Sequence, residues 1–375
     1  MATTTAHPPS QPDPTSQNTR LQEIKQFDES KIGVKGLVDR GLTTIPSFFI
    51  HPNPPEQNPK NSPAANVDPI SKLDPKPTIP VIDFSAPRSA LVDQLRRASS
   101  SLGFFQIINH SVPPSSINKI LGSIQQFFEL PEEKKMEYYT RDMTRGAAYS
   151  TNFDLYQSKA ASWRDTFQMG LSPNPPKWEN VPVTFREAVA EWDKQVAKIS
   201  EEVMGILCEG LGLERSDDEL KELWDGRVMA THYYPYCPQA ELTAGLTSHT
   251  DPGLLTVLVQ NEVLGLQVKV GEEWVDVVPV EGAIVFNIGD NFQIMSNDQY
   301  KSVEHRVFAN PLRNPRVSIA VFLTPGHRDH LCGPFPELIS AEKPAVYRQF
   351  TLSDYMARFF TKELDGKTLT NYYRI

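Results

Sequence analysis

The chain of 375 residues has few cysteines and no long apolar run. Its three cysteines, Cys208, Cys237 and Cys332, lie far apart and form no Cys-x-x-Cys pair. So sparse a set is typical of reduced thiols in a cytosolic protein and excludes a disulfide framework or a cysteine-based zinc site. No stretch approaches the roughly 18 apolar residues that suggest a membrane span. We therefore expect a cytoplasmic protein.

Clusters of positive charge are also absent. The formal net charge is −9, and no Lys/Arg-rich run interrupts the sequence. Nucleic acids and anionic membranes are therefore poor candidate partners, which leaves a small molecule as the expected one. The first 18 residues contain no apolar core of the kind that a secretory signal has. The composition does not indicate an oligomeric state.

Composition divides the chain into five expected segments. Residues 1–20 are polar and predict a disordered tail, and residues 21–77 form an N-terminal extension with a short helix and then a proline-rich linker. Residues 78–225 predict an N-terminal α/β region with one long helix, residues 226–325 a β-rich core, and residues 326–375 a C-terminal helix and tail. We find no internal repeat.

The long helix is expected from Phe185 to Leu211. Apolar residues recur there at alternating spacings of four and three and make one continuous stripe: Phe185, Val189, Trp192, Val196, Ile199, Val203 and Ile206. Three heptads of this kind could also form a coiled-coil seam. Flanking Pro/Gly-rich segments favour a helix packed along a sheet.

The β-rich core consists of short runs separated by turn signals. Seven strands are expected at 229–234, 254–260, 266–270, 274–277, 283–288, 302–309 and 316–323. This pattern predicts a mainly β fold with flanking helices, built around a jelly-roll (double-stranded β-helix) core. An amphipathic helix follows, with Thr351 or Ser353 as its N-cap.

His249 and Asp251 are the first candidate site residues. Residues i and i+2 of an extended chain project to the same face, so an imidazole and a carboxylate can converge at the start of a strand. They supply two members of the 2-His-1-carboxylate triad that suits non-haem Fe(II). A His-x-Asp pair also arises by chance, and His327 with Asp329, next to His330, is a second example.

The sequence downstream favours the first pair. His305 lies within an expected strand and can supply the second imidazole, since strands distant in sequence are neighbours in a jelly roll. Arg316 and Ser318 repeat the i, i+2 spacing and can bind a carboxylate through a guanidinium and a hydroxyl. The rival pair lies on a Pro/Gly-rich loop with no such anion clamp.

Together these motifs resemble the plant Fe(II)/2-oxoglutarate-dependent dioxygenases. Further resemblance lies in the segments at 80–83, 103–110, 130–134 and 232–239, so that it covers roughly residues 35–360. The stretch at 27–36 is similar to the branch that contains deacetoxyvindoline 4-hydroxylase and the aminocyclopropane-carboxylate oxidase homologues.

The resemblance implies roles for individual residues. His249, Asp251 and His305 would bind Fe(II), and Arg316, Ser318 and Tyr234 would hold 2-oxoglutarate. With O2, and ascorbate as the expected reductant, such an enzyme converts 2-oxoglutarate to succinate and CO2 and oxidises its substrate by hydroxylation or demethylation.

The family also implies a substrate pocket over the iron. Its candidate residues are Tyr149, Phe153, Tyr156, Phe322, Thr324 and Phe359, with Phe360 beside the last as part of a lid. Aromatic walls suit a bulky metabolite such as an alkaloid, coumarin or phenylpropanoid, although aromatic residues at such spacings also form ordinary cores. His110 is expected to be structural. His232 stands where the family commonly has Asn, and its role stays open.

Two alternative functions remain at this point. An aminocyclopropane-carboxylate-type oxidase shares the iron site but uses ascorbate in place of 2-oxoglutarate. A non-catalytic jelly-roll binding protein would need no triad, so the presence of one disfavours it.

Overall fold

The structure, a computed structural model, describes residues 14–55, 78–214, 217–361 and 368–375. Most of the expected tail (1–13), most of the proline-rich linker (56–77) and part of the C-terminal tail (362–367) lie outside the described residues.

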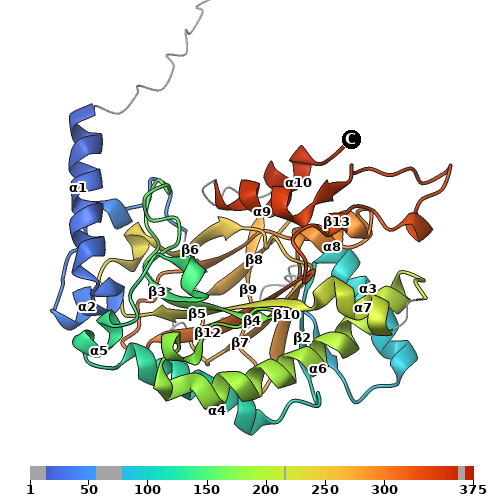
Figure 1. The fold of residues 1–375 in the computed structure, drawn as a ribbon, viewed down its shortest axis with the longest axis horizontal. Helices are drawn as coiled ribbons and strands as arrows, with labels where there is room; N and C mark the ends of the chain where they lie inside the picture. The colour runs from blue at the N-terminus through green and yellow to red at the C-terminus, as the bar shows by residue number, and fades with distance from the viewer. Residues whose placement is uncertain (1–13, 56–77, 215–216, 362–367) are drawn as a thin grey trace, which may run out of the picture.

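Two facing sheets form the centre of the molecule (Figure 1). The larger has the order β1-β2-β10-β7-β12-β5-β4-β3, and the smaller has the order β6-β11-β8-β9. This confirms the mainly β fold with a double-stranded β-helix core. The strands are β1 (Val81–Asp83), β2 (Phe104–Ile108), β3 (Ala147–Ser150), β4 (Asp165–Ser172), β5 (Gly226–Tyr234), β6 (Ala244–His249), β7 (Leu255–Gln260), β8 (Leu266–Val270), β9 (Glu273–Asp276), β10 (Ile284–Ile288), β11 (His305–Phe308), β12 (Arg316–Thr324), β13 (Leu331–Cys332) and β14 (Phe350–Thr351).

Helices cover the outer face of the larger sheet. There α4 packs on β5, β7 and β12, and α6 packs against α3 and α4 along the lower side in Figure 1. The α-helices are α1 (Pro14–Ser30), α2 (Gly33–Asp39), α3 (Arg88–Ser101), α4 (Pro114–Phe128), α5 (Glu132–Met136), α6 (Arg186–Gly210), α7 (Asp217–Trp224), α8 (Asp290–Met295), α9 (Leu352–Phe360) and α10 (Thr368–Tyr372). Among the described residues, none of the helices could span a bilayer.

The long helix α6 agrees with its sequence pattern. All seven residues of the expected stripe are buried, and they join the main core between the larger sheet and its helices. The stripe therefore packs within one molecule, as the helix-on-sheet interpretation requires. The helix ends at Gly210, at the glycines that the sequence places there.

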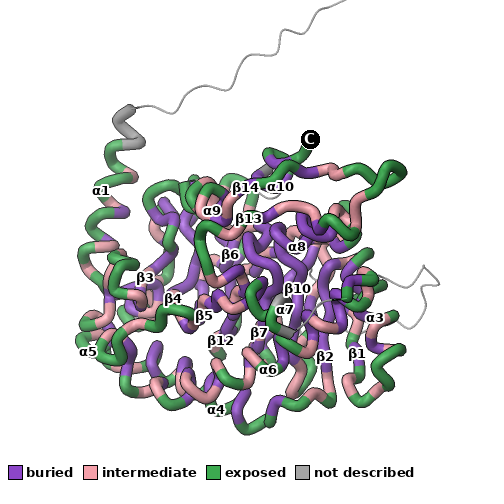
Figure 2. The backbone as a smooth tube through the Cα atoms, turned by 45° about the vertical axis from the view of Figure 1, so that its right-hand side comes forward, coloured by how far each residue is buried: buried purple, intermediate pink, exposed green. Residues whose placement is uncertain are grey.

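The N-terminal extension packs on the rest of the molecule. Its helix α1 begins at Pro14, whereas a disordered tail was expected up to residue 20. The expected boundary of the tail therefore lies too far toward the C-terminus. Apolar residues of α1 and of the short 3-10 helix Ser47–Phe49 form a second cluster that includes Ile24, Phe27, Phe49 and Trp163. In Figure 2 the residues of α1 differ in burial along the helix, because only one side of it packs against the protein.

The expected strands of the β-rich core all appear, with shifts of up to three residues at their ends. Strand β6 is an addition that the sequence analysis missed, and so are β3, β4 and α8. Thr351 is the N-cap of α9, and its side chain accepts a hydrogen bond from the Asp354 amide at 3.3 Å.

Candidate metal centre and cosubstrate site

The three candidate iron ligands meet inside the barrel. His249 ends β6 and is the antiparallel register partner of His305, the first residue of β11. Directly opposed residues of an antiparallel pair project to the same face, so the two imidazoles lie side by side, with ring centroids 4.2 Å apart. Oδ1 of Asp251 is 3.6 Å from Nε2 of each histidine. All three residues are buried.

Asp251 reaches this point from a loop. The sequence analysis put His249 and Asp251 together at the start of one strand, but His249 ends β6 and Asp251 precedes β7. The carboxylate therefore converges with His249 because the chain turns there. The two side chains do converge as expected, but the prediction that both lie on one strand is wrong.

Backbone carbonyls orient both imidazoles. Nδ1 of His249 lies 2.8 Å from the Thr247 carbonyl, and Nδ1 of His305 lies 3.2 Å from the Val303 carbonyl. A proton on each Nδ1 satisfies these contacts and leaves the Nε2 lone pairs directed at Asp251. Histidines that bind metal ions are commonly held in this way.

Asp251 divides its two oxygens between metal site and protein. Its Oδ2 accepts hydrogen bonds from Thr256 Oγ1 at 2.5 Å and from Asn287 Nδ2 at 2.7 Å. Its Oδ1 is left facing the imidazoles. The sequence analysis missed both donors, although Asn287 is an amide within the otherwise apolar strand Ile284–Ile288.

Burial and mutual charge set the protonation of the cluster. Burial lowers the pKa of His249 to about 3, and His305 acts in the same direction. Burial opposes ionisation of Asp251, but the imidazoles outweigh it and hold its pKa well below the ordinary value. Burial would lower the pKa of His305, yet the Asp251 carboxylate raises it. A metal ion that binds here therefore competes with a proton on His305.

Next to the metal centre lies a buried anion clamp. Arg316 is 1% exposed, and its guanidinium donates to Ser318 Oγ at 3.1 Å and to Gln260 Oε1 at 2.7 Å. Its Nε and the Gln260 Nε2 are buried and have no hydrogen-bond partner among the described residues. A carboxylate with two acceptor oxygens fits these donors, so the residues present suit 2-oxoglutarate.

The clamp depends on close backbone contact. A Cβ on Gly265 would lie 2.7 Å from Cδ of Arg316, so a larger residue there would displace the guanidinium. The Tyr234 ring stacks over that guanidinium, with the Arg316 Cζ 4.9 Å from its centroid. The pairing of β12 with β5 brings these side chains together, because Arg316 lies opposite Tyr234 and Ser318 lies opposite His232.

His232 lies opposite Ser318 of the clamp on the neighbouring strand. Its Nδ1 lies 3.0 Å from Thr166 Oγ1, and the ring is buried. Burial, and then the charges of Arg164 and Arg316, hold its pKa well below the ordinary value. His232 is therefore a neutral hydrogen-bonding group between the clamp and the metal centre.

The other histidines of the described residues lie outside the metal centre. Among the described residues, His249, Asp251 and His305 are the one cluster suited to a metal ion, and the rival set of His327, Asp329 and His330 forms none. His110 contacts the Gly282 carbonyl through Nε2 at 2.9 Å, in line with its expected structural role.

The expected pocket residues divide into two groups. Phe322 shares the inner face of β12 with Arg316 and Ser318, opposite Thr256, and Thr324 lies two residues further along that face. Tyr149 lies on the other face of the sheet, fully buried against Phe127, Phe128 and Tyr139. It belongs to the helix-side core, because strand alternation turns it away from the iron ligands, and we leave it out of the proposed pocket.

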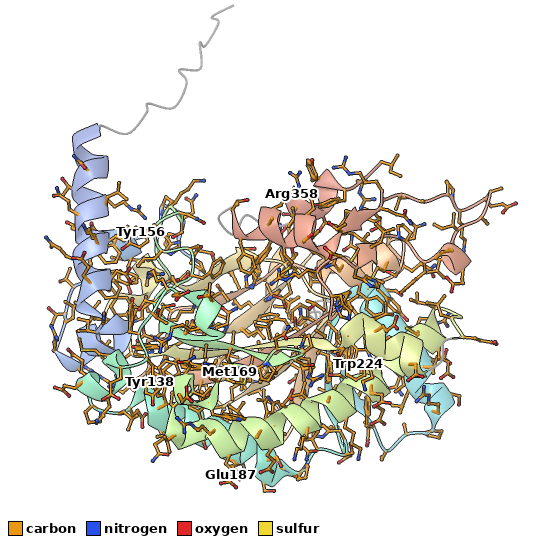
Figure 3. The ribbon with its side chains drawn as sticks, in the orientation of Figure 1. Tyr138, Tyr156, Met169, Glu187, Trp224 and Arg358 are labelled. Carbon is orange, nitrogen blue, oxygen red and sulfur yellow. The ribbon has the colours of Figure 1, made fainter. Side chains whose placement is uncertain are left out.

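An exposed aromatic group spans two segments above the barrel. Phe153 is 41% exposed and contacts Phe359 and Phe360 of α9, with centroid distances of 6.5 and 6.1 Å. Tyr156 lies beside α1 in Figure 3, well apart from Arg358 of α9, and its hydroxyl donates to Asp28 Oδ2 at 2.9 Å. Of the two loop aromatics, only Phe153 contacts α9.

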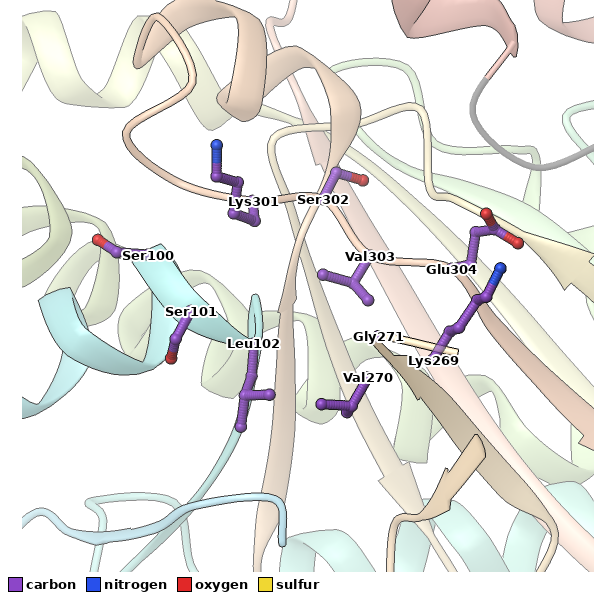
Figure 4. A pocket seen from close by; sticks show the side chains of 10 residues that line it. All are labelled: Ser100, Ser101, Leu102, Lys269, Val270, Gly271, Lys301, Ser302, Val303 and Glu304. Carbon is purple, nitrogen blue, oxygen red and sulfur yellow. The ribbon is translucent and has the colours of Figure 1, made fainter. Parts of the chain in front are cut away.

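A separate hollow of about 420 Å³ lies near the C-terminal end of α3 (Figure 4). It is lined by Ser100–Leu102, Lys269–Gly271 and residues 301–304. None of the iron or clamp residues lines it, so it is distinct from the metal centre.

Comparison with known proteins agrees with this geometry. Residues 226–325 match the family model described as the 2OG-Fe(II) oxygenase superfamily, and residues 79–189 match the one described as non-haem dioxygenase in morphine synthesis N-terminal. Similar proteins include 1-aminocyclopropane-1-carboxylate oxidase homolog 3 of Arabidopsis thaliana, 39% identical over 95% of this chain and 97% of that protein. A homolog from Solanum lycopersicum is 40% identical over 95% of this chain and 97% of its own length.

Solved structures are similar as well. JOX2, in complex with 2OG, Fe and JA, has a TM-score of 0.78 and 30% identity, covering 92% of this chain and 98% of that one. The rice dioxygenase for auxin oxidation has a TM-score of 0.64 and 28% identity, covering 78% and 99%. Family, fold and ligand set agree, and the chain belongs to the 2OG-Fe(II) oxygenase superfamily as a dioxygenase that uses Fe(II), 2-oxoglutarate and O2.

Proposed function

We propose that this dioxygenase hydroxylates or demethylates a bulky, aromatic or alkaloid-like specialised metabolite. In this proposal His249, Asp251 and His305 hold Fe(II), and Arg316, Ser318 and Tyr234 hold 2-oxoglutarate. Phe153, Phe322, Thr324 and Phe359 line the substrate pocket, and Tyr156 lies at its outer rim.

One observation carries the choice of cosubstrate. The buried guanidinium of Arg316 has no carboxylate partner among the described residues, and its Nε lacks any hydrogen-bond acceptor. A buried, unpaired charge is unfavourable, so the site is best balanced when an anion is bound. The distal carboxylate of 2-oxoglutarate supplies that anion, and its 2-oxo acid end is left for the metal.

The chain's own residues then position the reaction. Bound Fe(II) couples the oxidative decarboxylation of 2-oxoglutarate by O2 to the oxidation of a substrate C–H bond. The carbonyls of Thr247 and Val303 keep the two imidazoles in the ligating orientation, and Thr256 and Asn287 hold the carboxylate. The apolar residues around the site keep bulk water from the reacting groups.

The pocket supports an aromatic substrate more than a small polar one. Phe322 is half-buried on the inner face beside Thr256. Above the barrel, the exposed Phe153 and Phe360 and the half-buried Phe359 offer apolar surface. The similar solved structures include JOX2 in complex with JA and the rice dioxygenase for auxin oxidation. Both names refer to small molecules.

The test is succinate formation by purified protein with Fe(II), 2-oxoglutarate, ascorbate and a panel of alkaloids, coumarins and phenylpropanoids. We expect substrate-stimulated release of one succinate per 2-oxoglutarate consumed. Absence of succinate with every member of the panel, and without any substrate, would refute the proposal.

A second candidate is an ascorbate-dependent oxidase of aminocyclopropane carboxylate. The names of the similar plant proteins favour it, since they are called homologs of that enzyme. Ethylene release from aminocyclopropane carboxylate with ascorbate but without 2-oxoglutarate would support this candidate. The Arg316 clamp, which has no carboxylate partner among the described residues, favours the 2-oxoglutarate-dependent candidate.

A further inference from the structure

A second buried guanidinium, that of Arg164, lies beside the site. Arg164 is 3% exposed, and its Nε is buried without a hydrogen-bond partner. Among the described residues, no carboxylate pairs with its side chain. Arginine is almost never fully buried unless it is paired, so an isolated buried guanidinium points to an anion that the protein binds.

Strand geometry directs this side chain toward the metal centre. Arg164 immediately precedes β4, where Thr166 contacts His232 on the inner face and Asp165 faces outward to accept from the Val34 and Lys35 amides. Alternation along an extended chain puts Arg164 on the same face as Thr166. Continuing the pairing of Asp165 with Tyr233 by one residue opposes Arg164 to Tyr234.

A further hydrogen bond agrees with this direction. The preceding residue, Trp163, donates its backbone N–H to the Ala244 carbonyl at 2.7 Å, which ties the segment to the strand that ends at His249.

Arg164 and Arg316 differ in what surrounds them. Arg316 is seated by Ser318, Gln260 and the Tyr234 ring, as a fixed clamp for one carboxylate. The side chain of Arg164 has no such partners among the described residues. Arg164 directly precedes β4, the strand that pairs with the one carrying Tyr234 and His232. With one carboxylate of 2-oxoglutarate at Arg316 and the other at the metal, the second guanidinium is left for another anion.

We propose that Arg164 binds a carboxylate of the organic substrate and thereby holds its apolar body over the iron. The inference rests on the proposed function and narrows it, because the substrate becomes an aromatic or bulky apolar acid. The acid group lies at Arg164, and the apolar part extends toward Phe322 and the aromatic group of Phe153 and Phe359.

The test is anaerobic calorimetry on the full-length protein loaded with Fe(II) and 2-oxoglutarate. The probes are matched pairs, cinnamate with methyl cinnamate and 2-naphthoate with methyl 2-naphthoate, in which a methyl group replaces the negative charge of the acid. We expect the wild type to bind at least one acid tenfold or more tightly than its ester. Arg164→Gln should abolish that preference, Arg164→Lys should retain part of it, and the exposed control Arg97→Gln should keep all of it.

Several outcomes would overturn the proposal. Esters that bind the wild type as tightly as their acids in every pair, or a preference that survives Arg164→Gln, would do so. A raised KM for 2-oxoglutarate in Arg164→Gln with unchanged acid preference would assign the guanidinium to the cosubstrate instead. Because binding is measured without turnover, a wild type that never forms succinate refutes the proposed function separately.

A stability measurement separates binding from a structural role. Arg164→Met removes the unpaired charge at similar length, so the Tm of the ligand-free protein should stay equal or rise. A marked fall in Tm would show that Arg164 supports the fold, and would contradict a role in ligand binding.

Discussion

At the scale of single residues, each of the three candidate ligands has one polar atom hydrogen-bonded to the protein and another directed at the metal centre. Each imidazole uses Nδ1 for a backbone carbonyl and keeps Nε2 for the centre. Asp251 uses Oδ2 for two protein donors and keeps Oδ1. Each ligand therefore presents one atom in a fixed orientation, which lowers the entropy lost when a metal ion binds.

Asn287→Ala tests this division of atoms. Loss of the Nδ2 donor leaves the Asp251 carboxylate less firmly held, and we expect the affinity for Fe(II) to fall about 10- to 100-fold. Anaerobic titration with Fe(II) measures it, with Asn174→Ala on an exposed loop as the matched control. An Asn287→Ala protein with the affinity of the wild type would contradict the role given to this amide.

Arg316→Lys tests the cosubstrate clamp. An ammonium keeps the charge but cannot present two parallel donors, so at least one charge-assisted hydrogen bond, about 1.5–3 kcal/mol, is lost. We expect the KM for 2-oxoglutarate to rise at least about tenfold, measured by initial rates of succinate formation. Arg97→Lys is the control, and an unchanged KM in Arg316→Lys would exclude the clamp.

At the scale of elements, the N-terminal extension is fastened to the sheet by a buried carboxylate. The backbone amides of Val34 and Lys35 in α2 both donate to Asp165 at 2.8 Å, and Thr151 Oγ1 donates to it at 2.6 Å. Burial raises the pKa of Asp165, although these hydrogen bonds oppose the shift. Docking of α2 therefore supports the segment that carries Arg164 and Thr166 into the site.

Gly33→Ala tests that docking. Gly33 has φ +69°, and a Cβ there would lie 2.5 Å from Tyr149 Oη and 2.6 Å from Asp165 Oδ1. We expect a loss of about 1–3 kcal/mol from the clash, beyond the backbone term, in urea unfolding. Gly41→Ala isolates the backbone term, because Gly41 has φ +75° and nothing within 4 Å of its Cβ position. Equal losses in the two variants would contradict the close packing at Gly33.

Elements were predictable where the sequence carries a strong period. The stripe of α6 and the apolar runs of β7, β10 and β12 have one, and their positions follow from it. Strand β6 was missed because Gly245, Thr247 and Ser248 make Ala244–His249 look like a loop. Among the described strands it pairs with β11 alone, a partner about sixty residues away that no local pattern reveals.

The site was predictable to the extent that residue chemistry alone identifies it. Histidine, aspartate and arginine at these spacings indicate a metal and an anion, and the structure brings together His249, Asp251 and His305. The roles of Thr256, Asn287 and Arg164 depend on what lies opposite them in three dimensions. Tyr149 was assigned to the pocket because the strand pairing that turns it outward was unknown.

At the scale of the whole molecule, iron and 2-oxoglutarate should stabilise the fold. In the proposed assignment both bind between the two sheets of the folded state, so a ligand at 100 times its Kd adds about 2.7 kcal/mol to the free energy of unfolding. We expect Co(II), as a redox-stable substitute, with 2-oxoglutarate to raise the Tm of the wild type. His249→Ala should remove most of the rise, and an equal rise in that variant would indicate a metal site elsewhere.

The most direct test of the central claim is the rate of Fe(II)-dependent 2-oxoglutarate decarboxylation in two histidine variants. His305→Ala removes a proposed ligand, whereas His330→Ala removes one of the two histidines of the rival set on the loop after β12. We predict that decarboxylation falls to background in His305→Ala and keeps the wild-type rate in His330→Ala. Wild-type decarboxylation in His305→Ala, or its loss in His330→Ala, would contradict an iron centre built from His249, Asp251 and His305.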